Sequence, residues 1–459
     1  MVKILSYNVF FKAMQIPANL KNVSNFIEKY GPYDFVGLQE ATNWSIIQKN
    51  TPVLRKMTAI AYKEDFDEIV TFYDTYKYQL DDNENKLFGH MADINRPISI
   101  LFFRDNLCII NLHAGHYSLD KNGNKIKDIY KLNYYIKRIL SKNKHKDKFM
   151  EKLQSYDIIM MGDFNDKLAD INFNLLGRQL YGINKNVTCC TSNLALNQHR
   201  LISDHILSTF PNNKTIVIPN LDASDHAPII STLRKNIGYD FDGVLHMSVT
   251  APDQEGQRHP LSINGPYQIF NEIIDKIIRD IHNGNQIFII TARTKSKTSI
   301  NAINDHIKSS KLYPYRDQIT ILFSAGQPKI NLLNEYGINT FYDDSCLRIK
   351  ELYHAKLNNQ LPLLTQIYFV NPDYHSYQLV TKNNNYCYEK IKENVEICIN
   401  TINQLIINHD YRFKNPEINI LLGQLKNGIE NNSISIKECS KLQNDIIRLI
   451  NVELNQEKN

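Results

Sequence analysis

The sequence has no apolar run long enough to cross a membrane and no recognisable secretion signal. A membrane-spanning helix needs roughly 18 or more apolar residues, and no stretch of the 459 residues approaches this. The first residues, MVKILSYNVFFKAM, are too polar, and their apolar run is too short, for a signal peptide. We therefore expect an intracellular, cytoplasmic protein with no membrane partner.

Cysteine is sparse and is not arranged for cross-linking. The chain has seven cysteines, an odd number, and none of them forms a C-x-x-C. The adjacent pair Cys189 and Cys190 suits neither a disulfide framework nor a zinc site. We expect buried thiols in a reducing compartment.

A strong charge of one sign and a P-loop are also absent. The formal charge is +5 and the pI is near 8.6, which is compatible with a polyanionic partner without identifying one. Because no G-x-x-x-x-G-K-[ST] occurs, the chain encodes no P-loop kinase activity. With 42% hydrophobic residues and this length, two or three well-packed domains are expected.

The first half of the chain alternates short apolar runs with helical patterns. The runs predict buried strands, and they read KILSYNVF, DFVGLQE, PISILFF, NLCIINLH and YDIIMMGDF. Residues 120–155, between the last two runs, are helical in period and rich in lysine. This segment could follow a phosphate backbone, or it could be a solvated helix face.

From Asn236 the pattern changes to strands that alternate with single helices. Strands are predicted in IGYDF, QIFIITA, ITILFS and NTFYDD, with helices near 267–282 and 296–310. This alternation predicts an α/β domain with a parallel, Rossmann-like sheet. Beyond residue 360 we expect a strand at 366–380 and then a mainly helical appendage, in which no chemical motif is found.

Polar residues stand at or just beyond the ends of the predicted strands of the first half. They are Asn8, Glu40, His113, Asp163, Asn165, Asp204, Asp225 and His226. Several such residues, each following an apolar run, indicate convergence on one pocket. Carboxylate and amide oxygens are ligands for Mg²⁺, a histidine held by a carboxylate can stabilise phosphoryl charge, and a further aspartate can activate water. The set suits metal-assisted hydrolysis of phosphodiesters, with Glu40 as the best candidate ligand.

These residues, with the motifs GDFN and SDHAP in this order, resemble the endonuclease/exonuclease/phosphatase superfamily over residues 1–233. The resemblance implies an α+β four-layer β-sandwich with flanking helices and hydrolysis dependent on Mg²⁺, with Mn²⁺ as a possible substitute. It implies that Glu40 and Asn8 bind the metal, that Asp163 positions the water and that Asn165 holds the phosphate. It also implies that Asp204 orients His226 and that Asp225 supports the metal or the histidine.

The sequence departs from that pattern, and other readings stay open. Some members carry an acid where this chain has Phe10, which puts a second metal position in doubt, and FFKAMQ replaces the basic loop of abasic-site nucleases. Taken alone, His113 is more often a satisfied core histidine than a catalyst, and His116 is expected to be structural. Asp166 and Asp222 are expected to form turns.

A second set of acids follows the strands of the second half. In IGYDFDGVLH, a buried run ends on Asp240 and Asp242, and a glycine then allows a sharp exit. Two carboxylates there suit covalent phosphoryl transfer, in which one attacks and the other moves protons. Thr291 and Lys329 could hold a phosphate, and Asp343 with Asp344 could hold Mg²⁺.

The order DFDGV, ITAR, Lys329 and YDD resembles the haloacid dehalogenase-like phosphatases over residues 236–355. The resemblance implies that Asp240 is the nucleophile, Asp242 the general acid/base, Thr291 and Lys329 the phosphate ligands, and Asp343 with Asp344 the Mg²⁺ ligands. The gaps between these motifs are too short for a lid domain, which favours a bulky substrate such as a nucleic-acid end or a phosphoprotein over a small phosphomonoester.

Three functional hypotheses follow. The leading one is a bifunctional enzyme acting on nucleic acid, RNA or DNA, that hydrolyses phosphodiesters with residues 1–233 and removes terminal phosphates with residues 236–355. The alternative is a phosphatase acting on inositol phosphates or other small phosphate esters. In the third, one domain is a degenerate scaffold that only binds. No role is assigned to residues 360–459.

Overall fold

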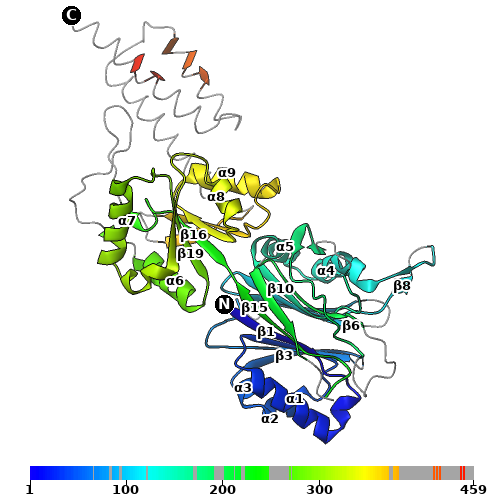
Figure 1. The fold of residues 1–459 in the computed structure, drawn as a ribbon. Helices are drawn as coiled ribbons and strands as arrows, with labels where there is room; N and C mark the ends of the chain where they lie inside the picture. Colours follow the sequence, from blue (N-terminus) through cyan, green and yellow to red (C-terminus); the bar gives the residue numbers. More distant parts are fainter. Residues whose placement is uncertain are drawn as a thin grey trace, which may run out of the picture. The chain divides into compact units, whose positions relative to one another are not determined.

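The structure, a computed structural model, is shown in Figure 1. The structure describes residues 1–381 and some helical residues between 417 and 449. Within the first range it leaves out residues 66, 82–84, 92–95, 120–121, 169–172, 191–200, 211, 219–222, 248–267, 270 and 372–375. The chain forms two compact units, one of Met1–Asp344 with Leu352–Leu379 and one of Ser345–Glu351 with Val380–Asn459.

The first sheet of the larger unit has six strands in the order β14-β15-β1-β2-β4-β3. These are β1 (Val2–Asn8), β2 (Phe35–Gln39), β3 (Thr58–Glu64), β4 (Asp67–Tyr73), β14 (Asn212–Val217) and β15 (Ile229–Arg234). β1 and β2 are parallel, and the register opposes Asn8 to Gln39. Glu40 therefore leaves the sheet beside the end of β1.

The second sheet has five strands in the order β13-β10-β7-β6-β5. These are β5 (Lys86–Met91), β6 (Arg96–Phe103), β7 (Leu107–His113), β10 (Asp157–Asp163) and β13 (Asp204–Ser208). Asp163 pairs with His113 of parallel β7 on one side and with Asp204 of antiparallel β13 on the other. Residues that oppose each other across strands project to the same face, so the three side chains form one row.

Helices cover the outer face of each sheet. One hydrophobic core joins Ile4 and Phe35 of the first sheet to Ile109 and Met161 of the second, so the two sheets pack face to face. Helices α1 (Pro17–Tyr30), α2 (Trp44–Asn50) and α3 (Pro52–Arg55) share a core with the first sheet, and α4 (Leu132–Ser141) and α5 (Lys146–Ser155) share one with the second. The four-layer sandwich predicted for the first half of the chain is confirmed.

The row of polar residues lies at the end of the inter-sheet core. Side chains alternate along a strand, and Met161 and Ile206 of that core stand two residues from Asp163 and Asp204. Asn8 continues the inward face of β1 by the same alternation. The polar side chains of both sheets therefore meet at one edge of the sandwich.

Short elements complete this half. They are the 3-10 helices η1 (Ala13–Gln15) and η2 (Asp128–Lys131) and the paired strands β8 (Ser118–Leu119) with β9 (Lys125–Ile126) and β11 (Phe173–Leu175) with β12 (Arg178–Leu180).

The third sheet follows β15 directly in sequence and has the order β20-β19-β16-β21-β22-β23. Its strands are β16 (Asn236–Tyr239), β19 (Gln286–Thr291), β20 (Ile319–Phe323), β21 (Thr340–Asp343), β22 (Gln366–Asn371) and β23 (Ser376–Leu379). All neighbouring pairs are parallel except β22 with β23. The strand predicted near 366–380 is thus part of this sheet.

The helices of this half begin and end close to the predicted positions. They are α6 (Asn271–His282), α7 (Lys297–Ser309), η3 (Tyr313–Gln318), α8 (Ile330–Glu335) and α9 (Cys346–Leu357), and a small pair joins β17 (His246–Met247) to β18 (Gln268–Ile269). Most of the helical appendage predicted for 384–455 lies outside the described residues. In the part of the chain that the structure describes, no helix is both long enough and apolar enough to cross a membrane.

Strand β10 packs closely against β7 at Gly162, the residue before Asp163. Its φ is +149°, and a Cβ built on it would lie 1.9 Å from the carbonyl oxygen of Leu112. Gly162→Ala should lower the free energy of unfolding by about 3 kcal/mol, because strand β7 must move or the backbone must change conformation. Gly177→Ala, with a φ of +90° but nothing within 4 Å, is the matched control and should cost only about 1 kcal/mol. Equal denaturation midpoints for the two variants would contradict this reading of β10.

Candidate active sites

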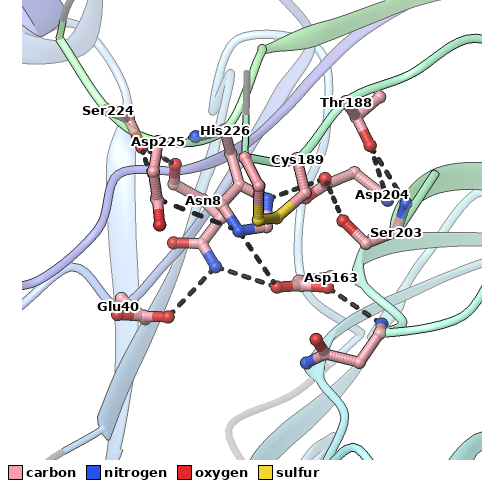
Figure 2. The surroundings of a disulfide bond; sticks show 12 residues. Asn8, Glu40, Asp163, Thr188, Cys189, Ser203, Asp204, Ser224, Asp225 and His226 are labelled. Atoms are coloured by element: carbon pink, nitrogen blue, oxygen red, sulfur yellow. Dashed lines mark hydrogen bonds and ion pairs between the residues drawn. A yellow bond between two sulfur atoms is a disulfide. The ribbon is translucent and has the colours of Figure 1, made fainter. Parts of the chain in front are cut away.

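The first candidate site is held together by the amide of Asn8. Its Nδ2 donates to Asp163 Oδ2 at 3.0 Å and to Glu40 Oε1 at 3.2 Å. Figure 2 shows the three side chains turned toward one another. Asp163 comes from one sheet and Asn8 from the other, so the contact joins the two sheets at the polar edge.

The turn after β1 supports this arrangement through its main chain. The Phe10 amide donates to Asn8 Oδ1 at 3.0 Å, and the Phe11 amide donates to Glu40 Oε2 at 3.2 Å. Phe10 and Glu40 both have positive φ values, 56° and 53°.

His226 and Asp204 form a buried ion pair beside Asp163. His226 Nδ1 lies 2.8 Å from Asp204 Oδ2, and its Nε2 lies 3.7 Å from Asp163 Oδ2. Burial lowers the pKa of His226, but the charges of Asp204, Asp163 and Asp225 outweigh burial and raise that pKa to about 10. A doubly protonated ring has no lone pair for a metal, so His226 is better suited to donate a hydrogen bond to an anion.

Asp225 stands among other acids, as a cation site would require. Burial and the neighbouring charges of Glu40 and Asp163 raise the pKa of Asp225 to about 6, against the opposing effect of His226. Carboxylates that raise one another's pKa are stabilised by a cation among them. The carboxylates of Glu40 and Asp225 supply oxygen donors of the kind that fits Mg²⁺ or Mn²⁺. The remaining oxygen of the expected set is Asn8 Oδ1, which accepts from the Phe10 amide while Nδ2 faces Glu40 and Asp163.

His113 is both a buried histidine and a member of the site. Its Nδ1 lies 2.7 Å from Asp67 Oδ2, to which Arg96 Nη1 also donates at 3.0 Å. Its Nε2 lies 3.6 Å from Asp163 Oδ2 and 3.8 Å from Glu40 Oε1. Sequence reasoning missed Asp67 and Arg96, because it considered only residues at the ends of strands and these two begin strands. In an antiparallel pair, one strand begins at the same edge of the sheet where its neighbour ends, so such residues can also reach the site.

Asn165 is fixed by the turn after β10. Its φ is 50°, its amide nitrogen donates to Asp163 Oδ1 at 2.9 Å and its Nδ2 donates to the Ala114 carbonyl at 2.7 Å. Asp166 accepts from the Leu168 amide at 2.8 Å, which is the turn-forming contact expected of it. His116 is exposed, and Asp222 lies outside the described residues.

A disulfide joins Cys189 to Cys190, so the expectation that the cysteines are thiols is wrong for this pair. Neighbouring side chains can meet here because Cys190 has a φ of 65°, in the left-handed region. Cys346 is also disulfide-bonded, whereas Cys108 is the buried free thiol expected. The cysteine pattern therefore does not identify a reducing compartment.

The disulfide lies against the loop that carries Asp225 and His226 (Figure 2). Cys189 makes a bridge pairing with His226, and the Cys190 amide donates to the Asp225 carbonyl at 2.7 Å. The preceding residue, Thr188, accepts at Oγ1 from the amide of Asp204 at 3.1 Å. Sequence reasoning assigned this segment no role, although its main chain positions both members of the His226–Asp204 pair.

The second candidate site lies at the carboxyl ends of two adjacent parallel strands. Asp240 follows β16 and Asp343 ends β21, and Lys329 Nζ bridges them at 2.6 Å and 2.9 Å. One oxygen each of Asp240, Asp343 and Asp344 lie within 4.8 Å of one another. The structure thus brings together four of the five residues that the sequence assigned to nucleophile, phosphate and metal, and the fifth is Thr291.

Burial and like charge both act on the carboxylates of this cluster. Burial raises the pKa of Asp240 and the charge of Asp343 adds to the rise, against the opposing effect of Lys329. Carboxylate oxygens that lie this close together are stabilised by a divalent cation bound among them. Mg²⁺ or Mn²⁺ fits this donor set of carboxylate oxygens.

Asp242 and Thr291 lie beside the cluster with an arginine that sequence reasoning missed. Thr291 Oγ1 donates to Asp242 Oδ2 at 3.5 Å. Arg293 holds both oxygens of Asp242, with Nε at 2.9 Å from Oδ2 and Nη2 at 2.5 Å from Oδ1. Arg293 could have been found in the sequence, because it is the last residue of ITAR. A side chain two residues beyond Thr291 can reach the same strand end.

Comparison with known proteins finds a relative that matches the whole chain. Protein L684 of Acanthamoeba polyphaga mimivirus is 45% identical over 505 residues, an alignment that covers 100% of this chain and 99% of the mimivirus protein. No protein-family model matches the chain.

Solved structures align with about half of the chain. TDP2 from Caenorhabditis elegans aligns at 13% identity and a TM-score of 0.36, over 50% of this chain and 96% of that one. The mannosyl-6-phosphatase Bt3783 of Bacteroides thetaiotaomicron aligns at 15% identity and a TM-score of 0.36, over 51% of this chain and 99% of that one.

The ion pair of His226 and Asp204 predicts a titration. In EDTA, the ring of His226 should stay protonated past pH 9 in the wild type, and Asp204→Asn should lower its pKa by about 1–3 units because the main compensating charge is lost. Histidine ring ¹⁵N shifts measured by NMR as a function of pH report this titration.

The same pair predicts a dependence of stability on pH. The raised pKa of His226 stabilises the folded state fully below pH 6.5, its ordinary value, and this contribution is lost as the pH rises toward about 10. The wild type should therefore lose more unfolding free energy over this range than Asp204→Asn does. Parallel stability curves and an unchanged His226 titration in the variant would contradict the assignment.

Proposed function

We propose that this chain, which belongs to the same family as mimivirus protein L684, is a metal-dependent hydrolase of phosphate esters with two catalytic sites. Residues 1–233 would hydrolyse phosphodiesters in a nucleic acid, and residues 236–355 would remove terminal phosphates. The observation that carries the proposal is the meeting of Asn8, Glu40, Asp163 and the charged His226 at one edge of the sandwich.

At the first site, Glu40, Asn8 and Asp225 would hold a divalent cation, which neutralises phosphate charge when bound. Asp163 accepts a proton from the attacking water as the new P–O bond forms and the bond to the leaving oxygen breaks. His226, kept charged by Asp204, donates a hydrogen bond to the phosphoryl oxygens.

Two further groups assist this step. Asn165 follows Asp163 by two residues in the same turn, and its Nδ2, which donates to the Ala114 carbonyl in this structure, would turn to hold the phosphate. His113, oriented by Asp67, faces both Asp163 and Glu40, so it can stabilise the same developing charge. Asp163 is then the proton acceptor, and the other groups donate hydrogen bonds to the phosphate. In-line phosphoryl transfer requires both kinds of group.

At the second site, we assign residues 236–355 to a Rossmann-like haloacid dehalogenase-type phosphatase. An oxygen of Asp240 attacks the phosphorus while Asp242 protonates the departing oxygen, which leaves an aspartyl-phosphate. Water then attacks the phosphorus and gives its proton to Asp242, which releases phosphate and restores Asp240. Thr291 and Lys329 hold the phosphate, and Asp343 with Asp344 would hold Mg²⁺, which balances the charge of the cluster.

The charge of the chain and the position of its lysine-rich segment favour a nucleic-acid substrate. The chain is mildly basic, with a formal charge of +5, and its lysine-rich segment 120–155 contacts the first site through Lys127, which donates to the Asn165 carbonyl at 3.1 Å. A polyanion would be attracted to such a surface. Inositol phosphates and other small phosphate esters are the alternative substrates.

Single substitutions should separate the two activities. With end-labelled RNA and DNA oligonucleotides that carry 3′- or 5′-phosphates, Asp163→Asn should slow chain cleavage by at least about 100-fold and leave phosphate release intact. Asp240→Asn should do the opposite, because it removes the nucleophile, and EDTA should stop both reactions. Asp275→Asn, a change at a surface ion pair with Lys311, is the control and should alter neither.

Other outcomes decide between the hypotheses. Hydrolysis of small phosphate esters with no action on any oligonucleotide would replace the nucleic-acid reading by the alternative. Loss of both reactions in one variant would contradict two independent sites. Binding of oligonucleotides without turnover in Mg²⁺ or Mn²⁺ would identify a degenerate scaffold.

A further inference from the structure

Exposed aromatic side chains gather beside the first candidate site. Large apolar side chains are usually buried, and the exposed aromatic residues of the described chain are Tyr76, Tyr117, Tyr130, Tyr134 and Tyr313. Three of these five lie within residues 117–134. The exposed fractions there are 46% for Tyr117, 58% for Tyr130 and 61% for Tyr134. An aromatic cluster of this kind on a surface indicates a binding role.

Local structure explains why these tyrosines face outward together. Ile129, Leu132 and Ile136 are buried in the core under α4. Tyr130 in η2 and Tyr134 in α4 are four residues apart, so they share the opposite, outward face of consecutive helical turns.

Tyr117 stands four residues after His113 and directly before a small hairpin. It precedes β8, which pairs with β9 in the register Ser118 to Ile126. Lys125 Nζ lies 4.4 Å from the centre of the Tyr117 ring. The hairpin therefore places the exposed ring of Tyr117 beside the exposed Lys125, which stands two residues before Lys127.

This surface is continuous with the catalytic turn. Lys127 Nζ donates to the Asn165 carbonyl at 3.1 Å and lies 3.8 Å from Asp166 Oδ2. The hydroxyl of Tyr130 donates to Asp166 Oδ1 at 3.4 Å. Because the amide of Asn165 donates to Asp163, a ligand on this surface would lead directly to the candidate water-activating carboxylate.

The charge of the segment is positive. Residues 122–137 contain four lysines, Lys125, Lys127, Lys131 and Lys137, and one acid, Asp128, which is fully buried. Lysines with interleaved aromatic rings attract a phosphate backbone and stack bases. In a duplex the faces of the bases are covered, and inositol or sugar phosphates have no aromatic face. A surface that offers both aromatic rings and lysines should therefore bind single-stranded nucleic acid better than a duplex or a small sugar or inositol phosphate.

We propose that the tyrosine–lysine strip, made of Tyr117, Lys125, Lys127, Tyr130, Lys131 and Tyr134, binds the single-stranded part of a nucleic-acid substrate. The bases stack on the tyrosines, the phosphates contact the lysines, and the strand passes Asn165 on its way to Asp163. This inference rests on the proposed phosphodiesterase function and names the form of its substrate.

The test measures binding separately from catalysis. Fluorescence anisotropy of the full chain in EDTA, with labelled 12-mers of thymidine or uridine and a matched duplex, reports affinity without cleavage. Tyr117→Leu with Tyr134→Leu should raise the Kd for the single strands by about tenfold or more, because a leucine of similar size cannot stack. The Kd for the duplex should change far less.

Matched variants control for exposure and charge. Tyr76→Leu, at an exposed tyrosine outside the strip, should leave binding unchanged. Lys125→Gln should reduce the slope of log Kd against log salt by roughly 0.7, whereas Lys297→Gln, on an exposed turn of α7, should not. Equal effects of Tyr76→Leu and of the double variant, or tighter wild-type binding to duplex than to single strands, would overturn the proposal.

Turnover of bis(p-nitrophenyl) phosphate in Mg²⁺ separates failure of this inference from failure of the proposed function. Hydrolysis of this small diester that depends on Asp163, together with binding unaffected in the double variant, would reject the strip and retain the phosphodiesterase. Loss of single-strand binding in the double variant, with no wild-type turnover of any ester, would retain the strip and reject the phosphodiesterase.

Discussion

The carboxylate of Asp163 is the point on which the first site depends. It accepts hydrogen bonds from Asn8 of the opposite sheet and from the amide of Asn165, and it faces the ring nitrogens of His226 and His113. Strand pairing puts it there, since β10 lies between β7 and β13. Only a glycine before it permits the close approach of β7. Packing of the sandwich therefore determines where the acid sits, and the acid determines where the other polar groups converge.

The second site, at the end of the third sheet, must also hold carboxylates close together, and it does so with a lysine in place of histidines. There, Lys329 bridges two buried carboxylates, Asp240 and Asp343, that could not both be ionised side by side without it. In the first site the corresponding charge is carried by histidines, which are themselves held by Asp204 and Asp67. Among the described residues, each site brings several carboxylates close together, and a divalent cation bound among them would reduce their mutual repulsion.

The sequence predicted those parts of the sites that stand at strand ends. Asn8, Glu40 and Asp163 follow apolar runs of alternating strands, and the carboxyl ends of parallel strands meet at one edge. Asp67 and Arg96 were not predictable in this way, because they begin strands whose antiparallel pairing only the fold reveals. The Cys189–Cys190 disulfide was missed because its formation depends on a left-handed turn at Cys190 that no local pattern signals. Arg293 was missed for a related reason, since its bond to Asp242 joins segments far apart in the chain.

The most direct test of two separate cation-dependent sites is a titration with Mn²⁺, followed by electron paramagnetic resonance, on the full chain and two variants. The wild type should bind at two classes of site. Glu40→Gln should remove or weaken one class by about tenfold or more and Asp343→Asn the other, because each removes a charged ligand from one cluster. Retention of both classes in both variants, or a single class in the wild type, would contradict the account.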